Sequence, residues 1–343
     1  MKFLVTGATS GLGRNATEWL LESGYQVCAT GRNLQAGEEL SKLGAQFTAL
    51  DLVTASDEAY QQLMSDCDVI WHCAALSSPW GKYQDFYQAN VVVTQRLAQL
   101  AGKLGIKRFV HVSTPSLYFD FQSHLNIPEQ QLAKRFANNY AKTKYLAEEV
   151  IRQSISLYPQ TIYIMLRPRG IFGPYDRVLI TRVLDLIART KGTLPLPGAG
   201  KAFIDLTFVL NVVHAMFLAS TRQQLQSGEV FNITNQQPKP LHEMLTMLIK
   251  EKLQIDFSVR ALPYFVLYGL AFINEWLAKI TQKEPALTRY SVGTLYFDMT
   301  LNPDLASKRL GYKPIYSLEE GIDITAEWLL HNGNLPYGKT NHI

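Results

Sequence analysis

Residues 2–13, KFLVTGATSGLG, carry the pattern that decides the fold. The mostly apolar residues 2–6 come first and are typical of a short buried strand. Gly7, Gly11 and Gly13 follow, and the apolar residues after them recur at helical spacing. The stretch therefore predicts a strand, a tight glycine turn and a helix, which is the opening unit of a parallel sheet covered by helices.

The alternation of short apolar runs with helical patterns continues through the first half of the chain. This alternation is typical of parallel strands joined by helices, so we expect an α/β fold with a Rossmann-type doubly wound parallel sheet. The expected strands are 2–6, 26–30, 46–50, 68–72, 107–113 and 161–166, and the expected helices are 11–23, 83–103 and 138–157.

A change of pattern after residue 167 predicts a second, smaller and mostly helical lobe that binds substrate. Proline and glycine cluster after this residue, which is typical of loops. Strands expected at 203–207 and 229–233, with a helix near 211–219, return to the first domain. The predicted division is a first domain at 1–167 joined by 203–233, and a substrate-binding lobe at 168–202 and 234–343.

Composition and charge narrow the functional classes. Apolar residues make up 47% and charged residues 18% of the 343 residues, which is ordinary for a globular protein and argues against disorder. The net charge of +4 includes no basic run, so no nucleic-acid partner is expected. Cys28, Cys67 and Cys73 lack metal-ligand spacing, which indicates reduced thiols and no metal site. The start of the chain lacks the apolar segment of a signal peptide, so we expect a cytoplasmic protein.

The glycine turn has the chemistry to hold a dinucleotide. Glycine allows a tight turn, close approach of the backbone to a pyrophosphate, and close contact between helix and strand. The first N–H groups of the following helix offer partial positive charge to the phosphates. An ordinary turn is the alternative for so short a motif. The expected cofactor contacts are Gly7, Thr9, Ser10, Gly11, Leu12, Gly13 and Arg14.

The end of the second strand bears on which nicotinamide cofactor is used. An acidic residue there would bind the ribose 2′-hydroxyl of NAD, but the segment 29–33 (ATGRN) has none. Arg32 in this segment and Arg14 after the glycine turn supply guanidinium groups, which favour a 2′-phosphate. We therefore expect NADP(H) in preference to NAD(H), with two solvated arginines as the alternative.

Tyr140 and Lys144 are the expected catalytic pair. They stand four residues apart in a helical pattern, so their side chains share one face; an ordinary pair on a helix surface is the alternative for this spacing taken alone. A phenol with a pKa near ~10 is a poor acid–base group at neutral pH, and a neighbouring ammonium is expected to lower that pKa. Thr114 follows the fifth strand, at the edge where open α/β sheets bind ligands, and is expected to donate to the substrate oxygen. Ser116, two residues further, is expected to line the substrate.

These motifs in this order resemble the extended short-chain dehydrogenase/reductase superfamily, of the NAD-dependent epimerase/dehydratase type. Stretches within 79–90, 113–116 and 284–312 further resemble its 3β-hydroxysteroid dehydrogenase-like branch. The superfamily match comprises the glycine turn, Asp51-Leu52, His72 to Ala75, Asn90-Val91, Ser113-Thr114, Tyr140 to Lys144, and Arg167-Pro168 to Gly173-Pro174.

The resemblance implies roles for individual residues. Tyr140 would donate or accept the proton, Lys144 would hold the nicotinamide ribose, and Thr114 would bind the reacting oxygen. The protein is therefore expected to be an NAD(P)-dependent oxidoreductase acting on a ketone or secondary alcohol. Further cofactor contacts are expected from Asp51, Leu52, Ala74, Ala75, Asn90 and Pro168.

The substrate is expected to be hydrophobic, either sterol-like or 3-oxoacyl-like, because apolar residues gather where the nicotinamide is expected. Trp80, Tyr83 and Phe172 are the expected lining, although packing in a helical lobe explains the same residues equally well. The alternative is an epimerase or dehydratase acting on a sugar nucleotide. Phe119 and Leu210 depart from the pattern of sugar-nucleotide enzymes.

Two further expectations concern partners. Residues 262–280 form an apolar helical segment that Asn274 and Glu275 interrupt, so we expect a buried or interfacial helix. Contact of this helix with a membrane surface is the alternative. A homodimer through helices near Val91 and Tyr140 is expected by analogy with such folds.

Overall fold

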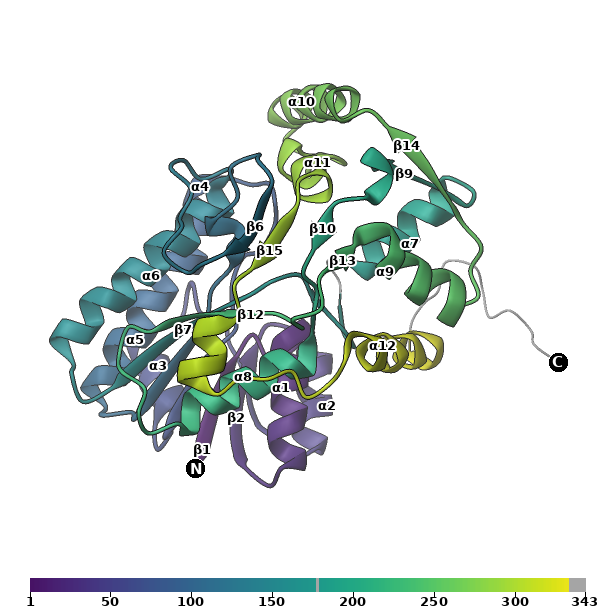
Figure 1. The fold of residues 1–343 in the computed structure, drawn as a ribbon. Coiled ribbons are helices and arrows are strands. Elements are labelled where there is room, and N and C mark those ends of the chain that lie inside the picture. Colours follow the sequence, from purple (N-terminus) through teal and green to yellow (C-terminus); the bar gives the residue numbers. More distant parts are fainter. Residues whose placement is uncertain (177–178, 333–343) are drawn as a thin grey trace.

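The computed structural model describes residues 1–176 and 179–332, and its centre is a seven-stranded parallel sheet (Figure 1). The strand order is β12-β7-β5-β4-β1-β2-β3, and every neighbouring pair is parallel. This arrangement confirms the predicted α/β doubly wound fold. The strands are β1 (Lys2–Thr6), β2 (Gln26–Gly31), β3 (Gln46–Ala49), β4 (Val69–His72), β5 (Arg108–Val112), β7 (Ile162–Pro168) and β12 (Val230–Ile233).

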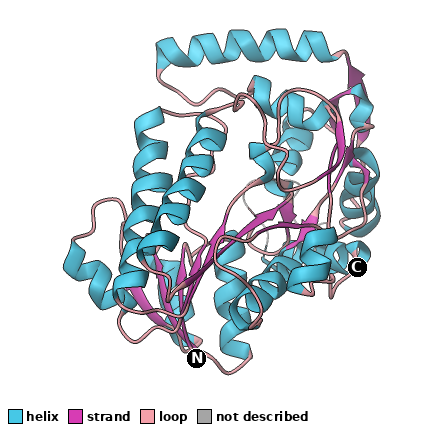
Figure 2. Cartoon of the chain, turned by 60° about the vertical axis from the view of Figure 1, so that its left-hand side comes forward, coloured by secondary structure: helices cyan, strands magenta, loops and turns pink. Residues whose placement is uncertain are grey.

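Helices cover both faces of this sheet (Figures 1 and 2). Alternate residues of a central strand serve two cores: Phe3 and Val5 of β1 pack into one cluster, and Leu4 packs into the other. The first cluster includes residues of α1 (Gly11–Glu22) and α8 (Val209–Thr221). The second cluster includes residues of α3 (Asp57–Met64), α5 (Val93–Lys103) and α6 (Asn139–Leu157), whereas α2 (Leu34–Lys42) connects β2 to β3.

The expected helix at 83–103 is continuous but not uniform. It begins as α4 (Tyr83–Phe86), passes through a π-helical turn at Tyr87–Val92 and continues as α5. A π turn adds a residue to the repeat and shifts which side chains face the sheet, a change that helical spacing alone does not reveal.

The second lobe contains a four-stranded sheet of order β13-β10-β15-β6 and a separate apolar core. Its sheet strands are β6 (His124–Ile127), β10 (Phe203–Ile204), β13 (Lys239–Pro240) and β15 (Met299–Leu301); two short pairs join β8 (Ile171–Phe172) to β11 (Thr207–Phe208) and β9 (Thr193–Pro197) to β14 (Ser258–Leu262). Its helices are α7 (Ile180–Arg189), α9 (Leu241–Leu245), α10 (Tyr264–Thr281), α11 (Arg289–Tyr296) and α12 (Leu318–Asn332).

The expected strand at 203–207 was wrong in its extent and its partners. It is split into β10 and β11, and neither joins the main sheet. Asp205 lies between them, where its carboxylate accepts the Leu301 N–H at 2.8 Å and ties this turn to β15. Within 203–233, α8 packs on the main sheet and β12 joins it as an edge strand. The end of the expected substrate lobe, 333–343, lies outside the described residues.

Candidate active site

The glycine turn between β1 and α1 packs so tightly that side chains are excluded. Gly7 has a positive φ of 68°, and a Cβ there would lie 2.9 Å from the Ala74 backbone. A Cβ on Gly13 would lie 2.2 Å from the Gly7 carbonyl oxygen. Ser10 makes no side-chain cap to α1, and the first turn of α1 carries no acidic residue. The turn therefore presents a helix N-terminus that suits an anionic group such as a pyrophosphate.

The other expected turn residues have two different environments. Thr9 packs over the end of β2. The closeness of this packing is shown by Gly31, where an added Cβ would lie 2.6 Å from the Thr9 hydroxyl oxygen. Ser10 is exposed at the turn, and Gly11 adopts a φ of 48° with open space beside it. Leu12 packs against the cores of both lobes, so its side chain is structural.

The two arginines expected at a 2′-phosphate differ in their partners. Arg14 is buried, and its Nε and Nη1 donate to Glu18 at 2.6 Å and to Glu39 at 3.0 Å. Two carboxylates thus already hold Arg14, so of the two arginines Arg32 is the better placed for a 2′-phosphate, and the contact of Arg14 remains a prediction. Arg32 is exposed at the end of β2, where the adenosine ribose is expected.

The loops after β3 and β4 contribute backbone and small side chains. Asp51 is exposed, and its Oδ1 accepts the Val53 N–H at 3.0 Å. Leu52 is buried in the core. Ala74 donates its N–H to the Thr6 hydroxyl at 3.2 Å. This hydrogen bond holds the segment that follows β4 beside the glycine turn. Ala75 is exposed at this edge.

Asn90, an expected cofactor contact, is buried between the loop after β4 and α6. It is 1% exposed, and its amide bonds the Leu76 N–H at 2.8 Å, the Leu76 carbonyl at 3.0 Å and the Thr143 hydroxyl at 3.1 Å. Its side-chain amide thus forms hydrogen bonds that join the loop after β4 to α6. Asn90 therefore positions that loop, and its contact with a cofactor remains a prediction. Pro168, the last residue of β7, is buried at the carboxyl edge.

The three expected catalytic side chains come together at this edge. Tyr140 and Lys144 project from one face of α6, and Thr114 follows β5. The Lys144 ammonium group reaches back to β5, where its Nζ donates to the Val112 carbonyl at 2.7 Å and lies 2.9 Å from His111 Nε2. His111 is therefore hydrogen-bonded to Lys144, a contact that sequence motifs did not indicate.

Burial sets the protonation of this pair and reverses one expectation. Burial raises the pKa of Tyr140 to about 12, and a side-chain hydrogen bond with Thr114 opposes the shift. Burial lowers the pKa of Lys144 to about 7, although the Glu148 carboxylate favours its charged form. The expected lowering of the Tyr140 pKa by Lys144 was wrong for this structure, because Lys144 is turned toward β5 and is itself driven toward neutrality.

Thr114 and Ser116 continue a line of hydroxyl groups that begins at Tyr140 and leads toward the second lobe. Thr114 Oγ1 donates to Ser116 Oγ at 3.0 Å, and Ser116 Oγ lies 2.6 Å from the Tyr290 hydroxyl. Tyr290 belongs to α11 and is 174 residues from Ser116 in sequence. It therefore joins the catalytic edge to the substrate lobe, which no local sequence signal indicated.

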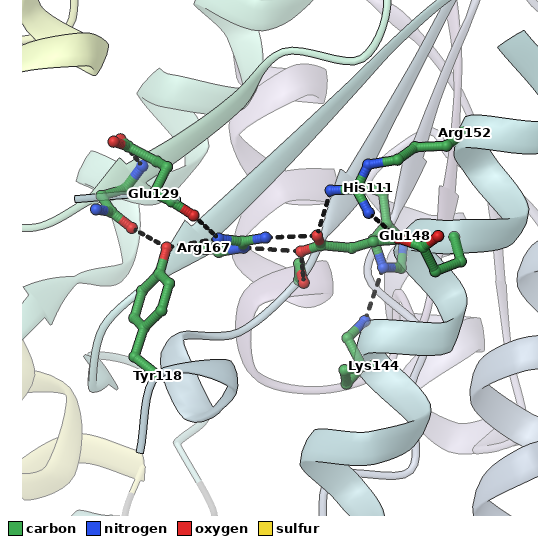
Figure 3. A network of polar contacts seen from close by, with 10 residues as sticks. His111, Tyr118, Glu129, Lys144, Glu148, Arg152 and Arg167 are labelled. Carbon is green, nitrogen blue, oxygen red and sulfur yellow. Dashed lines mark hydrogen bonds and ion pairs between the residues drawn. The ribbon is translucent and has the colours of Figure 1, made fainter. Parts of the chain in front are cut away.

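A buried ion pair supports the catalytic helix from behind (Figure 3). Arg167 donates from Nε and Nη2 to the Glu148 carboxylate at 2.8 and 2.5 Å, and the two side chains are at most 1% exposed. Arg167 Nη1 also donates to the Tyr118 hydroxyl at 2.7 Å, and Ser113 donates to Glu148 at 2.6 Å. Because Glu148 lies one turn beyond Lys144, this network fixes α6 against β5 and β7.

His72 is structural, as the sequence favoured. It is completely buried between the hydroxyls of Thr6 and Thr94, at 2.8 and 2.9 Å from its ring nitrogens. Burial, with a smaller effect of Lys144, lowers the pKa of His72 to about 3. A histidine that stays neutral at physiological pH does not serve as an acid–base catalyst there.

A cavity of about 700 Å³ lies beside the N-terminus of α6 and beneath α10. Trp80 and Tyr83 line it, together with Tyr290. Phe172, by contrast, is 2% exposed and packs on Phe208 in the core of the second lobe. The expectation for Phe172 was therefore wrong, because pairing of β8 with β11 directs this residue inward.

Arg169 is the cationic group that lies beside this line of hydroxyls without a carboxylate partner. It follows β7, the strand next to β5, so it lies at the same sheet edge as Thr114. Its Nε is buried and has no hydrogen-bond partner, and no carboxylate among the described residues lies within ion-pair distance. Burial lowers the pKa of Arg169, and the nearby Tyr290 and Asp205 oppose the shift. A guanidinium in this position is suited to an anionic ligand group.

Comparisons with known proteins show which family and which relatives this chain is similar to. The model of the NAD dependent epimerase/dehydratase family matches residues 3–234. The chain is 44% identical over 338 residues to the uncharacterized protein YbjS of Escherichia coli K12, covering 98% of this chain and all of that protein.

Two further relatives have described activities. The chain is 32% identical to 4-hydroxy-2-methyl-3-oxo-4-farnesyl-3,4-dihydroquinoline-1-oxide ketoreductase of Stigmatella aurantiaca, covering 94% of this chain and 95% of that protein. It is 34% identical to the decarboxylating sterol-4-alpha-carboxylate 3-dehydrogenase of Candida albicans, covering 83% of each.

Among solved structures, the epimerase Mth375 of Methanothermobacter thermautotrophicus has the same fold. Its TM-score is 0.79 at 21% identity, and the match covers 98% of this chain and 94% of that one.

Proposed function

The chain belongs to the NAD dependent epimerase/dehydratase family and is an NAD(P)-dependent oxidoreductase of the extended short-chain dehydrogenase type; we propose that it reduces the ketone of a hydrophobic substrate that carries a carboxylate. The observation that carries the proposal is the line of hydroxyls from Tyr140 through Thr114 to Tyr290, beside Arg169, whose buried Nε has no hydrogen-bond partner.

The residues around the glycine turn fit a dinucleotide. The close packing of Gly7 and Gly13 brings the backbone and the N-terminus of α1 to the position of a pyrophosphate, and no acidic residue in the first turn opposes an anion. When bound, the nicotinamide cofactor supplies the hydride chemistry. Arg32 supports a preference for NADP(H), which remains part of the proposal.

Tyr140 supplies the proton in this mechanism. Because burial raises the pKa of Tyr140 to about 12, its phenol is protonated at neutral pH and can donate to a ketone oxygen that is becoming an alkoxide. Thr114 donates a second hydrogen bond to the same oxygen and stabilises its developing negative charge. Lys144, held by His111 and Val112, orients the ribose side of the cofactor site.

The second lobe and Arg169 define the substrate class. Trp80 and Tyr83 give the cavity aromatic walls that suit an apolar chain or ring system. Arg169 supplies a half-buried cation near the reacting end, where a carboxylate close to the ketone would form a charge-assisted pair. One relative acts, by its name, on a sterol carboxylate, which agrees with this combination; another acts on a farnesylated ketone, which agrees with the apolar ketone alone.

The proposal is tested with a freshly prepared long-chain 3-oxo acid and its methyl ester, each with NADPH and NADH. We expect turnover of both substrates, followed by nicotinamide absorbance, with kcat/KM roughly tenfold or more higher for the acid. Tyr140→Phe should lower kcat by about 10²–10⁴-fold and leave cofactor affinity nearly unchanged.

Arg169→Met should lower kcat/KM for the acid to that of the ester, whereas Arg189→Met, at an exposed position of α7, should change neither. Equal kcat/KM for the acid and the ester would refute the role of Arg169 in recognising a carboxylate. It would not refute the oxidoreductase activity. Inversion or dehydration of a sugar nucleotide without a net absorbance change would instead favour the epimerase or dehydratase alternative.

A further inference from the structure

Helix α10 carries a continuous stripe of large apolar side chains that the rest of the protein leaves uncovered. Phe265, Trp276 and Ile280 are 74%, 57% and 62% exposed. The remaining residues of the stripe are Val266, Leu270, Phe272, Ile273 and Leu277, each more than 40% exposed. They recur at spacings of three and four, so they occupy one side of the helix.

The opposite side of α10 is also apolar, and it is packed. Leu267, Ala271 and Ala278 are buried against α11 and the rest of the lobe. A helix that is apolar all round is normally enclosed, but α10 lies along the outer edge of the molecule (Figures 1 and 2). Single exposed apolar residues need no explanation, whereas a stripe of eight on one helix indicates an interaction surface.

The charges around the stripe identify the kind of partner. The exposed charged residues near its ends are Arg260, Lys279, Lys283 and Glu284; three are cationic, and the one acidic residue, Glu284, lies 3.8 Å from Arg182. The one acidic residue within α10, Glu275, is buried and accepts from Arg289 at 2.7 Å. An apolar helix face bordered by lysine and arginine, with a tryptophan in the face, is the pattern of helices that lie in the interface of an anionic bilayer.

We propose that α10 docks the protein on the surface of an anionic phospholipid membrane, with the helix lying in the plane of the interface. Among the described residues no helix is long and apolar enough to span a bilayer, so the contact is peripheral. A second copy of the chain is the alternative occupant of the stripe, and the oligomeric state of the variants below distinguishes it from a membrane.

The location of the cavity gives the docking a consequence. Tyr268, Glu275 and Ala278, on the inner side of α10, line the cavity that we assign to substrate. A hydrophobic substrate dissolved in the bilayer would then leave the membrane next to the cavity that receives it. This consequence rests on the proposed function, whereas the docking of α10 does not.

The test is co-flotation of the full chain with vesicles of phosphatidylglycerol and phosphatidylcholine, compared with vesicles of phosphatidylcholine alone. We expect binding to the anionic vesicles and weak binding to the neutral ones. Ile273→Glu with Trp276→Glu should weaken binding by about tenfold or more, because two partly inserted side chains become charged. Lys279→Gln and Lys283→Gln should each weaken binding by about fivefold.

The matched control is Leu125→Glu with Ile315→Glu, which charges two exposed apolar residues far from α10 in sequence; its vesicle binding should equal that of the wild type. Turnover of a short, water-soluble ketone should be unchanged in the variant at positions 273 and 276, which establishes that it is folded. Absence of vesicle binding by the wild type would overturn the proposal. Conversion of a dimer to a monomer by the same variant would assign the stripe to a second copy and overturn it equally.

Discussion

Lys144 should make the stability of the protein depend on pH in a way that one substitution removes. Burial lowers its pKa from 10.5 to about 7 in the folded state. Because the unfolded chain then binds the proton more strongly, protonation favours unfolding, and stability should rise as the pH increases from 7 toward 10. For these two pKa values, the free energy of unfolding should rise by about 2 kcal/mol between pH 7 and pH 9.

The assay is urea unfolding at both pH values, followed by fluorescence, for the wild type and Lys144→Met. The substitution also leaves the Val112 carbonyl without its partner, so the diagnostic quantity is the difference in pH dependence between the two proteins. Lys142→Met, at an exposed position of the same helix, should retain the full dependence. An identical rise for wild type and Lys144→Met would refute the lowered pKa of Lys144.

Three further outcomes are expected. Gly13→Ala should lower dinucleotide affinity by more than about tenfold, measured by fluorescence titration, because its Cβ would lie 2.2 Å from the Gly7 oxygen; unchanged affinity would contradict the tight turn. Arg167→Met should destabilise the fold by about 3–5 kcal/mol in urea, because Glu148 would be left buried and unpaired, and adding Glu148→Gln should restore part of this loss. Arg32→Ala should raise the Kd for NADPH by about tenfold while the Kd for NADH stays constant; an equal effect on both would argue against contact with a 2′-phosphate.

The central strands were predictable because their signals are local. The apolar run 2–6 and the glycines after it specify a strand and a turn whatever surrounds them. Tyr140 and Lys144 were found for the same reason, since a spacing of four places them on one helix face. Arg14 and Asn90 were recognised as polar residues in motifs, but their bonds to Glu39 and Thr143 join separate elements and were not predictable from those motifs; their cofactor roles remain predictions.

Residues that meet across large sequence separations were not predictable. Tyr290 reaches Ser116 only because α11 of the second lobe lies over the end of β5. His111 has no motif of its own, and it becomes a partner of Lys144 only when α6 packs on the sheet. The exposure of α10 was likewise undecided by its composition, because an apolar sequence suits both a buried and an interfacial helix.

The sequence by itself determined the kinds of elements in the first domain, the glycine turn and the placement of Tyr140 and Lys144 on one helix face, since periodicity and steric demands act over a few neighbouring residues. The tertiary structure alone decided which polar groups form buried hydrogen bonds with one another, which arginines lie where a ligand can reach them, and in which direction each pKa shifts. These properties depend on desolvation and on contacts between distant segments, and both exist only once the chain is packed.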